Sequence, residues 1–247
     1  MNKNSNSYIF IYAAVLVIAV AALLSTAATL LKPLQEINVK VEKMQAILAS
    51  ANIETTPKNA EQVYNQYIKE ELVIDQQGAV ISTYKSGELQ GPIRAFDINM
   101  KQEVDNKAKG SEFKNPLFVC EKDGEILYVI PLRGKGLWGP VWGHVALKND
   151  FNTIAGVVFD HKGETPGLGA EISASKFQAQ FSGKTIFDKQ MIFKSITVKK
   201  GGVGTLTAAD QIHGVDAISG GTITSDGVND MLRDNIENYV PYIQKNR

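Results

Sequence analysis

Three glycine-rich clusters are the segments of this chain whose residue types and spacing are suited to binding a ligand. They are Arg133–Gly139, Glu164–Gly169 and Ser219–Ser225. Glycine lacks a Cβ, so the backbone of such a segment can approach a planar or phosphorylated ligand closely. Turns also collect glycine, and each cluster taken alone is equally well explained as a turn.

The third cluster contains four hydroxyl side chains, and three of them, Thr222, Thr224 and Ser225, lie immediately before a stretch with helical periodicity. At a helix start, free backbone N–H groups and the positive end of the helix dipole favour an anion such as a phosphate. Hydroxyl residues are also ordinary helix N-caps, and N-capping by Thr224 or Ser225 requires no ligand. The cluster therefore predicts either an anion site or a cap.

Charge and cysteine content exclude several classes of protein. The 247 residues include 26 basic and 26 acidic side chains, so no overall field attracts nucleic acid, and we predict no nucleic-acid partner. Cys120 is the single cysteine, which excludes a disulfide framework or a cysteine-ligated cluster within this chain alone. His144, His161 and His213 lack ligand-like spacing, so we predict no metal site. Any redox chemistry requires a borrowed cofactor.

An uncharged run from Tyr8 to Leu31 predicts a membrane-spanning helix. At about 1.5 Å per residue the run reaches about 36 Å, enough to cross a hydrocarbon core of about 30 Å. A cleaved signal peptide is the alternative, but the run exceeds its usual apolar core and Lys3 is the only charged side chain before it. Lysines after the run outnumber Lys3 and nominally place the C-terminal part in the cytoplasm.

The pattern after this run predicts four segments and a mixed α+β domain. The segments are an N-terminal tail (1–7), a transmembrane helix (8–31), a juxtamembrane helix and linker (32–56) and a soluble domain (57–247). In the soluble domain we expect helices over Ala60–Leu72, Ser173–Phe181 and Asp226–Tyr239, and strands over Leu117–Glu121, Glu125–Leu132, Val141–Lys148, Ile154–Asp160 and Met191–Val198. Asp123-Gly124 between the first two strands is a strong hairpin signal. Hairpins and helices that do not alternate regularly favour an α+β fold.

The segment Asp216–Thr224, with the sequence DAISGGTIT, closely resembles the flavinylation motif of the FMN-binding domain family. In that motif an aspartate is followed by Ser/Thr-Gly-Ala-Thr-x-Thr, and the last threonine receives FMN in phosphoester linkage. Thr224 occupies this position, and Gly221 stands where the family usually has alanine. Together with the other two clusters and the anchor, the motif resembles the C subunits of Na+-translocating NADH:quinone oxidoreductases.

The resemblance implies a membrane-anchored α+β FMN-binding domain that relays electrons towards quinone. It implies covalent FMN on Thr224, no catalytic residue on this chain, and a separate flavin transferase that places FMN on the motif. The implied partners are the other subunits of the reductase, this transferase and membrane lipid. The implied location is the bacterial inner membrane, single-pass, with the soluble domain in the periplasm. The implied cofactor-binding residues are Thr224, Ser219, Gly220, Gly221, Thr222, Asp216, Trp138, Glu164, Thr165, Gly167 and Leu168.

Three alternatives stay open at this point. The G subunits of the related Rnf electron-transfer complexes share the motif and the anchor. A flavin-free, membrane-anchored assembly protein would use its apolar stripes for partners and would be colourless. Within the site, Trp138 is equally well explained as a flavin contact or as a core residue.

Overall fold

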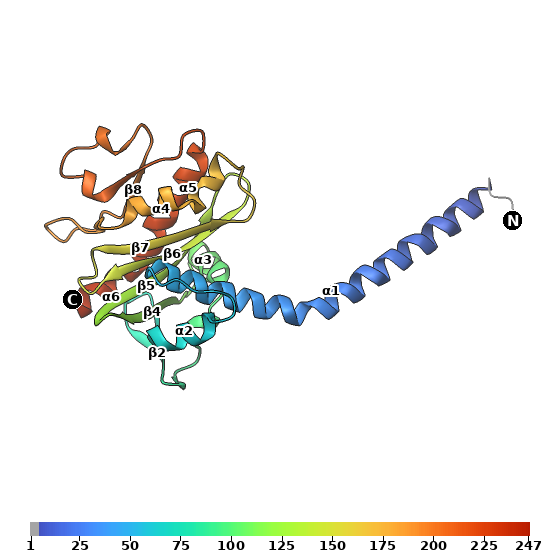
Figure 1. Ribbon diagram of the computed structural model, residues 1–247, viewed down its shortest axis with the longest axis horizontal. Helices are drawn as coiled ribbons and strands as arrows, with labels where there is room; N and C mark the ends of the chain where they lie inside the picture. The colour runs from blue at the N-terminus through green and yellow to red at the C-terminus, as the bar shows by residue number, and fades with distance from the viewer. Residues whose placement is uncertain (1–4) are drawn as a thin grey trace. The chain divides into compact units, whose positions relative to one another are not determined.

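The structure, a computed structural model, describes residues 5–247, so part of the predicted tail 1–7 lies outside the described residues. The chain forms two compact units, Met1–Lys43 and Met44–Arg247. Helix α1 (Asn6–Ser50) begins in the first unit and is continuous through Pro33 (Figure 1). Pro33 has no N–H and cannot donate to the carbonyl of Thr29, yet the helix continues beyond it.

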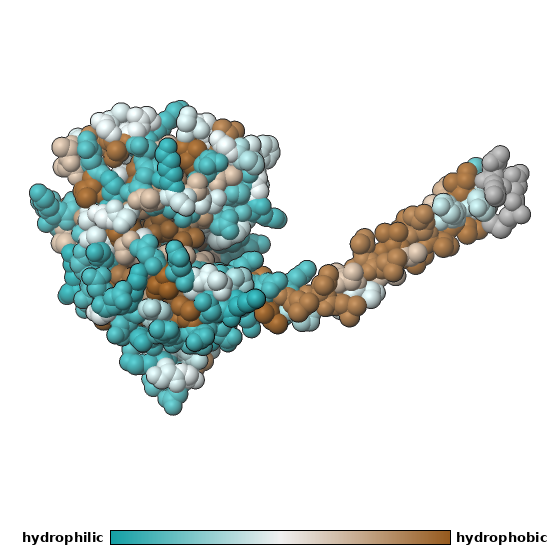
Figure 2. All heavy atoms as spheres, in the orientation of Figure 1, coloured by the Kyte–Doolittle hydropathy of each residue, from teal (hydrophilic) through white to brown (hydrophobic). Residues whose placement is uncertain are grey.

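The N-terminal part of α1 is long and apolar enough to cross a membrane, as predicted. Its side chains are predominantly apolar and exposed, and Figure 2 shows them as a mostly brown run. The hydroxyls of Thr26 and Thr29 donate to the carbonyls of Ala22 and Ser25, both at 2.8 Å. These bonds satisfy the two threonine hydroxyls of the run within the helix itself, which suits a hydrocarbon surrounding.

The second unit is built on a seven-stranded antiparallel sheet in the order β3-β2-β1-β4-β5-β6-β7. Its strands are β1 (Ile68–Ile74), β2 (Val80–Lys85), β3 (Glu88–Gln90), β4 (Asn115–Lys122), β5 (Glu125–Lys135), β6 (Pro140–Lys148) and β7 (Ile154–His161). A short parallel pair, β8 (Thr197–Lys199) and β9 (Gly214–Asp216), forms a second sheet. The α+β class predicted from sequence is confirmed.

Helices and 3-10 turns cover the sheet and connect its strands. They are α2 (Ala60–Tyr67), η1 (Ala95–Asp97), α3 (Met100–Ala108), η2 (Gly169–Ser173), α4 (Ser175–Gln178), η3 (Ala179–Phe181), η4 (Val203–Thr205), η5 (Gln211–His213), α5 (Thr222–Ile236), η6 (Glu237–Tyr239) and α6 (Val240–Asn246). The expected helix over Ser173–Phe181 is present as α4 with flanking 3-10 turns.

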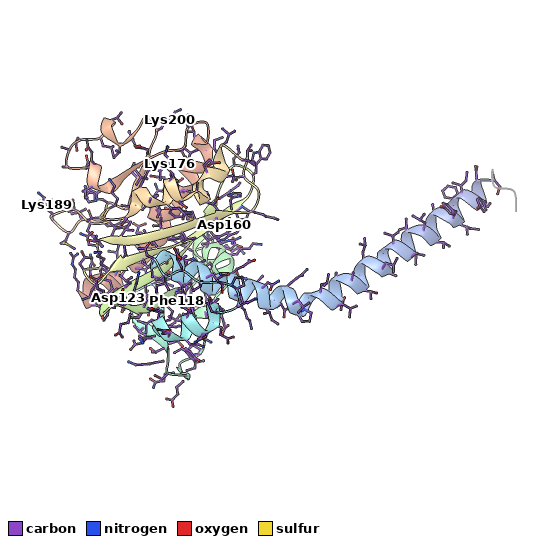
Figure 3. All side chains as sticks on the ribbon, viewed as in Figure 1. Phe118, Asp123, Asp160, Lys176, Lys189 and Lys200 are labelled. Carbon is purple, nitrogen blue, oxygen red and sulfur yellow. The ribbon has the colours of Figure 1, made fainter. Side chains whose placement is uncertain are left out.

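Neighbouring strand residues point to opposite sides of the sheet. Each side packs into its own hydrophobic cluster, so both faces are buried. Leu117 belongs to the core cluster that also contains Leu232 of α5, whereas Phe118 belongs to a second cluster with Leu48 of α1 and Tyr64 of α2. Phe118 is marked in Figure 3 within the sheet. This two-sided burial explains why β4 and β5 read as nearly continuous apolar runs rather than as alternating ones.

The two expected strand pairs are present. Asp123 and Gly124 join β4 to β5 with φ values of 53° and 81°, as a type I′ turn requires, and Asp123 is marked at this turn in Figure 3. Strands β6 and β7 pair antiparallel, and β5 and β6 form a long hairpin whose last pair is Lys135 with Pro140. The first glycine-rich cluster forms the end of β5 and the turn of this long hairpin.

Three predicted boundaries were wrong. The helix expected over Ala60–Leu72 ends at Tyr67, and the rest is β1, because the apolar residues from Ile68 onward pair with β2 and β4. The strand expected over Met191–Val198 is mostly irregular, since Met191 and Ser195 have φ values of 65° and 60°. The last helix begins at Thr222, not at Asp226.

Candidate functional site

The carboxylate of Glu164 joins the three glycine-rich clusters at one point. Its Oε2 accepts a hydrogen bond from the Thr224 hydroxyl at 2.6 Å, and its Oε1 accepts one from the Trp138 N–H at 2.9 Å. Both Glu164 and Thr224 are buried, with exposed fractions of 5% and 2%. The three clusters singled out from sequence therefore form one site.

Glycines allow the three clusters to approach one another this closely. A Cβ on Gly169 would lie 2.6 Å from Glu164 Oε2 and closer still to Thr224 Oγ1. A Cβ on Gly136 would lie 2.5 Å from Glu164 Oε1, and one on Gly221 would lie 3.2 Å from the backbone nitrogen of Gly169. Any side chain at these positions would displace the carboxylate, the hydroxyl or the backbone around them.

Packing of α5 on β5 places Thr224 beside the hairpin turn. A Cβ on Gly134 would lie 2.7 Å from Met231 Cβ, and a Cβ on Gly227 would collide with the Lys135 carbonyl. The helix thus lies against the end of β5 through two glycines, one on each element. This contact brings the start of α5 to the turn that carries Trp138.

Thr222, Thr224 and Ser225 of the third cluster lie inside α5 rather than before it. Gly221 is the N-cap, so the alternative in which Thr224 or Ser225 caps the helix is wrong. Thr222 is the first helical residue and is half-buried, and Thr224 lies buried in the first turn. The Ser225 Oγ accepts the Ile218 N–H at 3.1 Å and so holds the turn that leads into the helix.

Burial and hydrogen bonding act in opposite directions on the pKa of Glu164. Burial raises this pKa, whereas the bond from the Thr224 hydroxyl and the backbone N–H groups of Trp138, Gly139 and Leu137 lower it, and the net shift is downward. The carboxylate is therefore ionised at neutral pH and acts as a hydrogen-bond acceptor. An ionised acceptor makes each of these hydrogen bonds stronger than a neutral one.

Large apolar side chains are exposed around this buried pair. Trp138 is 70% exposed and Ile223 is 58% exposed, and Leu137 and Leu168 are exposed as well. Leu168 lies over Gly220, where an added Cβ would meet its Cδ2 at 2.6 Å. The alternative that Trp138 is a core residue is therefore wrong. The site combines a buried polar centre with an apolar rim, which is the arrangement of many cofactor sites.

The other predicted site residues lie in the segments that enclose the pair. Thr165 and Gly167 are exposed in the loop before η2, and the Gly167 N–H donates to Glu171 Oε1 at 3.0 Å. Ser219 and Gly220 are exposed in the turn before α5, where Gly220 has a φ of 74°.

The side chain of Asp216 bonds to a different segment from the Glu164–Thr224 pair. Its Oδ1 accepts the Val203 N–H at 2.6 Å, and its own N–H donates to Gln180 Oε1 at 2.9 Å. These bonds tie the end of β9 to the start of η4 and to η3. Within residues 5–247, no three His, Cys, Asp or Glu side chains are arranged to hold a metal ion.

The contact between Glu164 and Thr224 was missed from the sequence. Sequence reasoning placed both residues in the site but found no acceptor aligned with the threonine hydroxyl. The two residues are 60 positions apart, and no local spacing relates them. Asp160, which is labelled in Figure 3, lies near the end of β7. The chain leaves the sheet after this strand, and Glu164 follows three residues after His161 and contacts α5 through Thr224.

Comparison with known proteins agrees with this site. The FMN-binding domain family matches residues 136–237, a range that contains the Glu164–Thr224 pair and most of the first cluster. The C subunit of the Na(+)-translocating NADH-quinone reductase of Pseudomonas aeruginosa is 32% identical over 241 residues, covering 94% of this chain and 91% of that protein. The corresponding subunit of Neisseria meningitidis serogroup B is 33% identical, covering 87% and 84%.

Solved structures give the same result. The crystal structure of the C subunit from Parabacteroides distasonis superposes with a TM-score of 0.74 at 39% identity, covering 86% of this chain and 96% of that chain. The Shewanella oneidensis NqrC structure gives a TM-score of 0.64 at 26% identity, covering 84% and 99%. These relatives are subunits of the sodium-translocating reductase rather than of the Rnf complex. The chain belongs to the family of C subunits of Na+-translocating NADH-quinone reductases, with an FMN-binding domain behind its N-terminal apolar helix.

Proposed function

We propose that this chain carries one FMN, esterified through its phosphate to Thr224, and relays electrons towards quinone within the reductase. The observation that carries the proposal is the position of Thr224. Its hydroxyl lies in the first turn of α5, beneath an exposed apolar rim that includes Trp138 and Leu168. The match to the FMN-binding domain family spans this region.

The residues of the site fit the two parts of FMN. The first turn of a helix presents backbone N–H groups and the positive end of the dipole, which favour a phosphate by about 0.3–1 kcal/mol. The exposed side chains of Leu137, Trp138, Leu168 and Ile223 offer an apolar surface for the flavin ring. The cofactor would supply the redox chemistry, and these residues would hold and orient it.

Exposure of the apolar rim also suits exchange of electrons with other subunits. Trp138 and Ile223 are among the most exposed large apolar side chains of the second unit. A flavin held at this surface would lie within reach of a docked partner rather than deep in the core. We therefore propose that the neighbouring redox subunits of the complex dock over this rim.

For topology, we propose a single-pass protein of the bacterial inner membrane with residues 44–247 in the periplasm. The flavin transferase implied by the family works on that side, and this outweighs the lysine count around α1. Alkaline phosphatase fused after Arg247 folds only in an oxidising compartment and should be active. An inactive fusion that is present in the membrane would place the domain in the cytoplasm.

The test of attachment is the mass and in-gel flavin fluorescence of the denatured chain, produced in a host that has the flavin transferase. The wild type should fluoresce and be heavier by one FMN less water. Thr224→Ala should lose both signals, while Thr205→Ala, at an exposed threonine outside the three clusters, should keep them. An unmodified, colourless wild type would contradict the proposal and favour the flavin-free assembly role.

A further inference from the structure

We propose that Glu164 takes part in flavin attachment, as the group on this chain that orients the Thr224 hydroxyl and accepts its proton. This inference rests on the proposed function, because it concerns how the ester on Thr224 forms. The chain would then supply part of the catalytic site for its own modification, rather than only an acceptor sequence. The relevant geometry is the 2.6 Å bond between Thr224 Oγ1 and Glu164 Oε2.

A threonine hydroxyl is a poor nucleophile at neutral pH unless a base is aligned with its proton. The separation of 2.6 Å is at the short end of the range for proton transfer between a hydroxyl and a base. The second oxygen of Glu164 is held by the Trp138 N–H at 2.9 Å, so the carboxylate has a fixed orientation. The hydroxyl proton points at Glu164, which directs a lone pair of Oγ1 elsewhere, towards an incoming phosphorus.

The step balances without an oxidant or a reductant. The co-reactant is a flavin dinucleotide bound by the transferase, with a metal ion that activates its pyrophosphate. The Thr224 Oγ–P bond forms to the phosphorus on the flavin side, and the P–O bond to the adenylate breaks. Adenylate leaves with the electron pair of that bond, and the hydroxyl proton moves to Glu164 Oε2.

Charge within the site also favours transfer of the proton to Glu164. Before the step the site holds one ionised carboxylate, and its net downward pKa shift makes it a weak base at rest. A second negative charge nearby raises the pKa of a carboxylate, so the approaching phosphate strengthens this base. The new phosphodiester brings a second negative charge within bonding distance of Thr224 Oγ1. Protonation of Glu164 removes the first charge as the second arrives, which relieves the repulsion between two anions in the buried site.

Thr224 becomes accessible to the transferase through movement of the segment that covers it. Gly169 lies directly over the hydroxyl, and Leu168 lies over Gly220 beside it. The backbone hydrogen bonds of this segment are local, from the Leu168 and Ala170 N–H groups to the Thr165 carbonyl, both at 3.1 Å. The segment can therefore shift as a unit without breaking those bonds, while Glu164 stays held by Trp138.

The experiment measures the initial rate of flavin attachment to purified full-length chain that was made in a host without the transferase. Purified transferase, FAD and Mg2+ are added, and in-gel fluorescence follows the product. Glu164→Gln keeps the size and the acceptor for the Trp138 N–H but loses the base. It should lower kcat by about 10²-fold or more, with the KM for the chain unchanged.

Two further variants separate a proton acceptor from a structural residue. Glu171→Gln is the matched control, because Glu171 holds the same loop through the Gly167 N–H and has no bond to Thr224. It should react at the wild-type rate. Glu164→Asp keeps a carboxylate but is shorter, so it should react faster than Glu164→Gln if a base is required. A purely structural role predicts the opposite order, since Gln matches Glu in shape.

Each outcome supports or overturns a distinct claim. A Glu164→Gln variant that reacts within about threefold of the wild-type rate, or faster than the Asp variant, would overturn the role of Glu164 and leave the proposed function standing. A wild-type chain that gains no flavin would overturn the proposed function and this inference with it. If Glu164→Gln does not fold, as judged by Tm, the attachment rate of Glu164→Asp is compared with that of Glu171→Gln. An Asp variant that reacts at a rate near that of the control supports a carboxylate base. Loss of attachment in a folded Asp variant overturns the role of Glu164.

Discussion

Replacement of Gly169 by alanine tests how tightly the three clusters are packed. The added Cβ would lie 2.6 Å from Glu164 Oε2, about 0.8 Å short of an ordinary contact of 3.4 Å, and closer still to Thr224 Oγ1. Relief requires the carboxylate or the hydroxyl to move, and both are buried. Overpacking of this kind costs about 1–3 kcal/mol, so we expect the free energy of unfolding to fall by that amount.

Flavin attachment should be affected more strongly than stability. Moving Oε2 by about 0.8 Å lengthens the 2.6 Å bond to Thr224 beyond ordinary hydrogen-bonding distance. Small misplacements of reacting groups can lower rates by about 10²-fold. We therefore expect Gly169→Ala to remain folded, with a Tm several degrees lower and flavin attachment slowed by a factor of about ten or more.

Two alanine controls in the same segment isolate the cause. At Gly163 an added Cβ has no atom within 4 Å, so Gly163→Ala should match the wild type in stability and in labelling. At Gly167 the surroundings are also open but φ is 74°, so Gly167→Ala should lose about 1 kcal/mol from backbone strain alone. Stability is measured by denaturant unfolding and labelling by in-gel fluorescence. Equal behaviour of Gly169→Ala and Gly163→Ala would refute the close packing described here.

Three further predictions concern a hairpin turn, a buried ion pair and the pH dependence of stability. Gly124→Val should destabilise the domain by about 1–2 kcal/mol in denaturant unfolding, because a β-branched residue is strained at a φ of 81°, and no loss of stability would contradict the turn geometry. Arg94→Met should lower the free energy of unfolding by about 3–5 kcal/mol, because it leaves the buried Glu71 carboxylate without its ion pair at 2.6 Å. The same unfolding assay checks this value. A near-neutral effect would mean that the hydrogen bonds from Tyr64 and the Phe96 N–H are enough to stabilise the carboxylate. The folded pKa of Glu164 is depressed, so its contribution to stability should be present above the unfolded value of about 4.3 and be lost as pH falls through the folded value. The difference in unfolding free energy between wild type and Glu164→Gln, measured against pH, should therefore shrink on acidification, and a difference that grows would refute the sign.

Local patterns in the sequence were sufficient to predict several elements of this chain. The hairpin of β4 and β5 follows from Asp123-Gly124, since few residue pairs adopt positive φ at both positions. The membrane-spanning run follows from length and the absence of charge alone. Where a local pattern predicted the wrong element, contacts with distant residues explain the difference. Ile68 and the residues after it continue a helical periodicity, yet pairing with β2 and β4 makes them a strand.

The sequence by itself determined the motif that points to Thr224, the three glycine-rich clusters and the α+β class. It did so because turn chemistry, periodicity and motif spacing are properties of neighbouring residues. Only the tertiary structure decided that Trp138 is exposed and that Glu164 accepts the hydrogen bond of Thr224. Residues 60 positions apart meet because α5 packs on β5 through glycines, and such contacts depend on the whole sheet rather than on any local spacing.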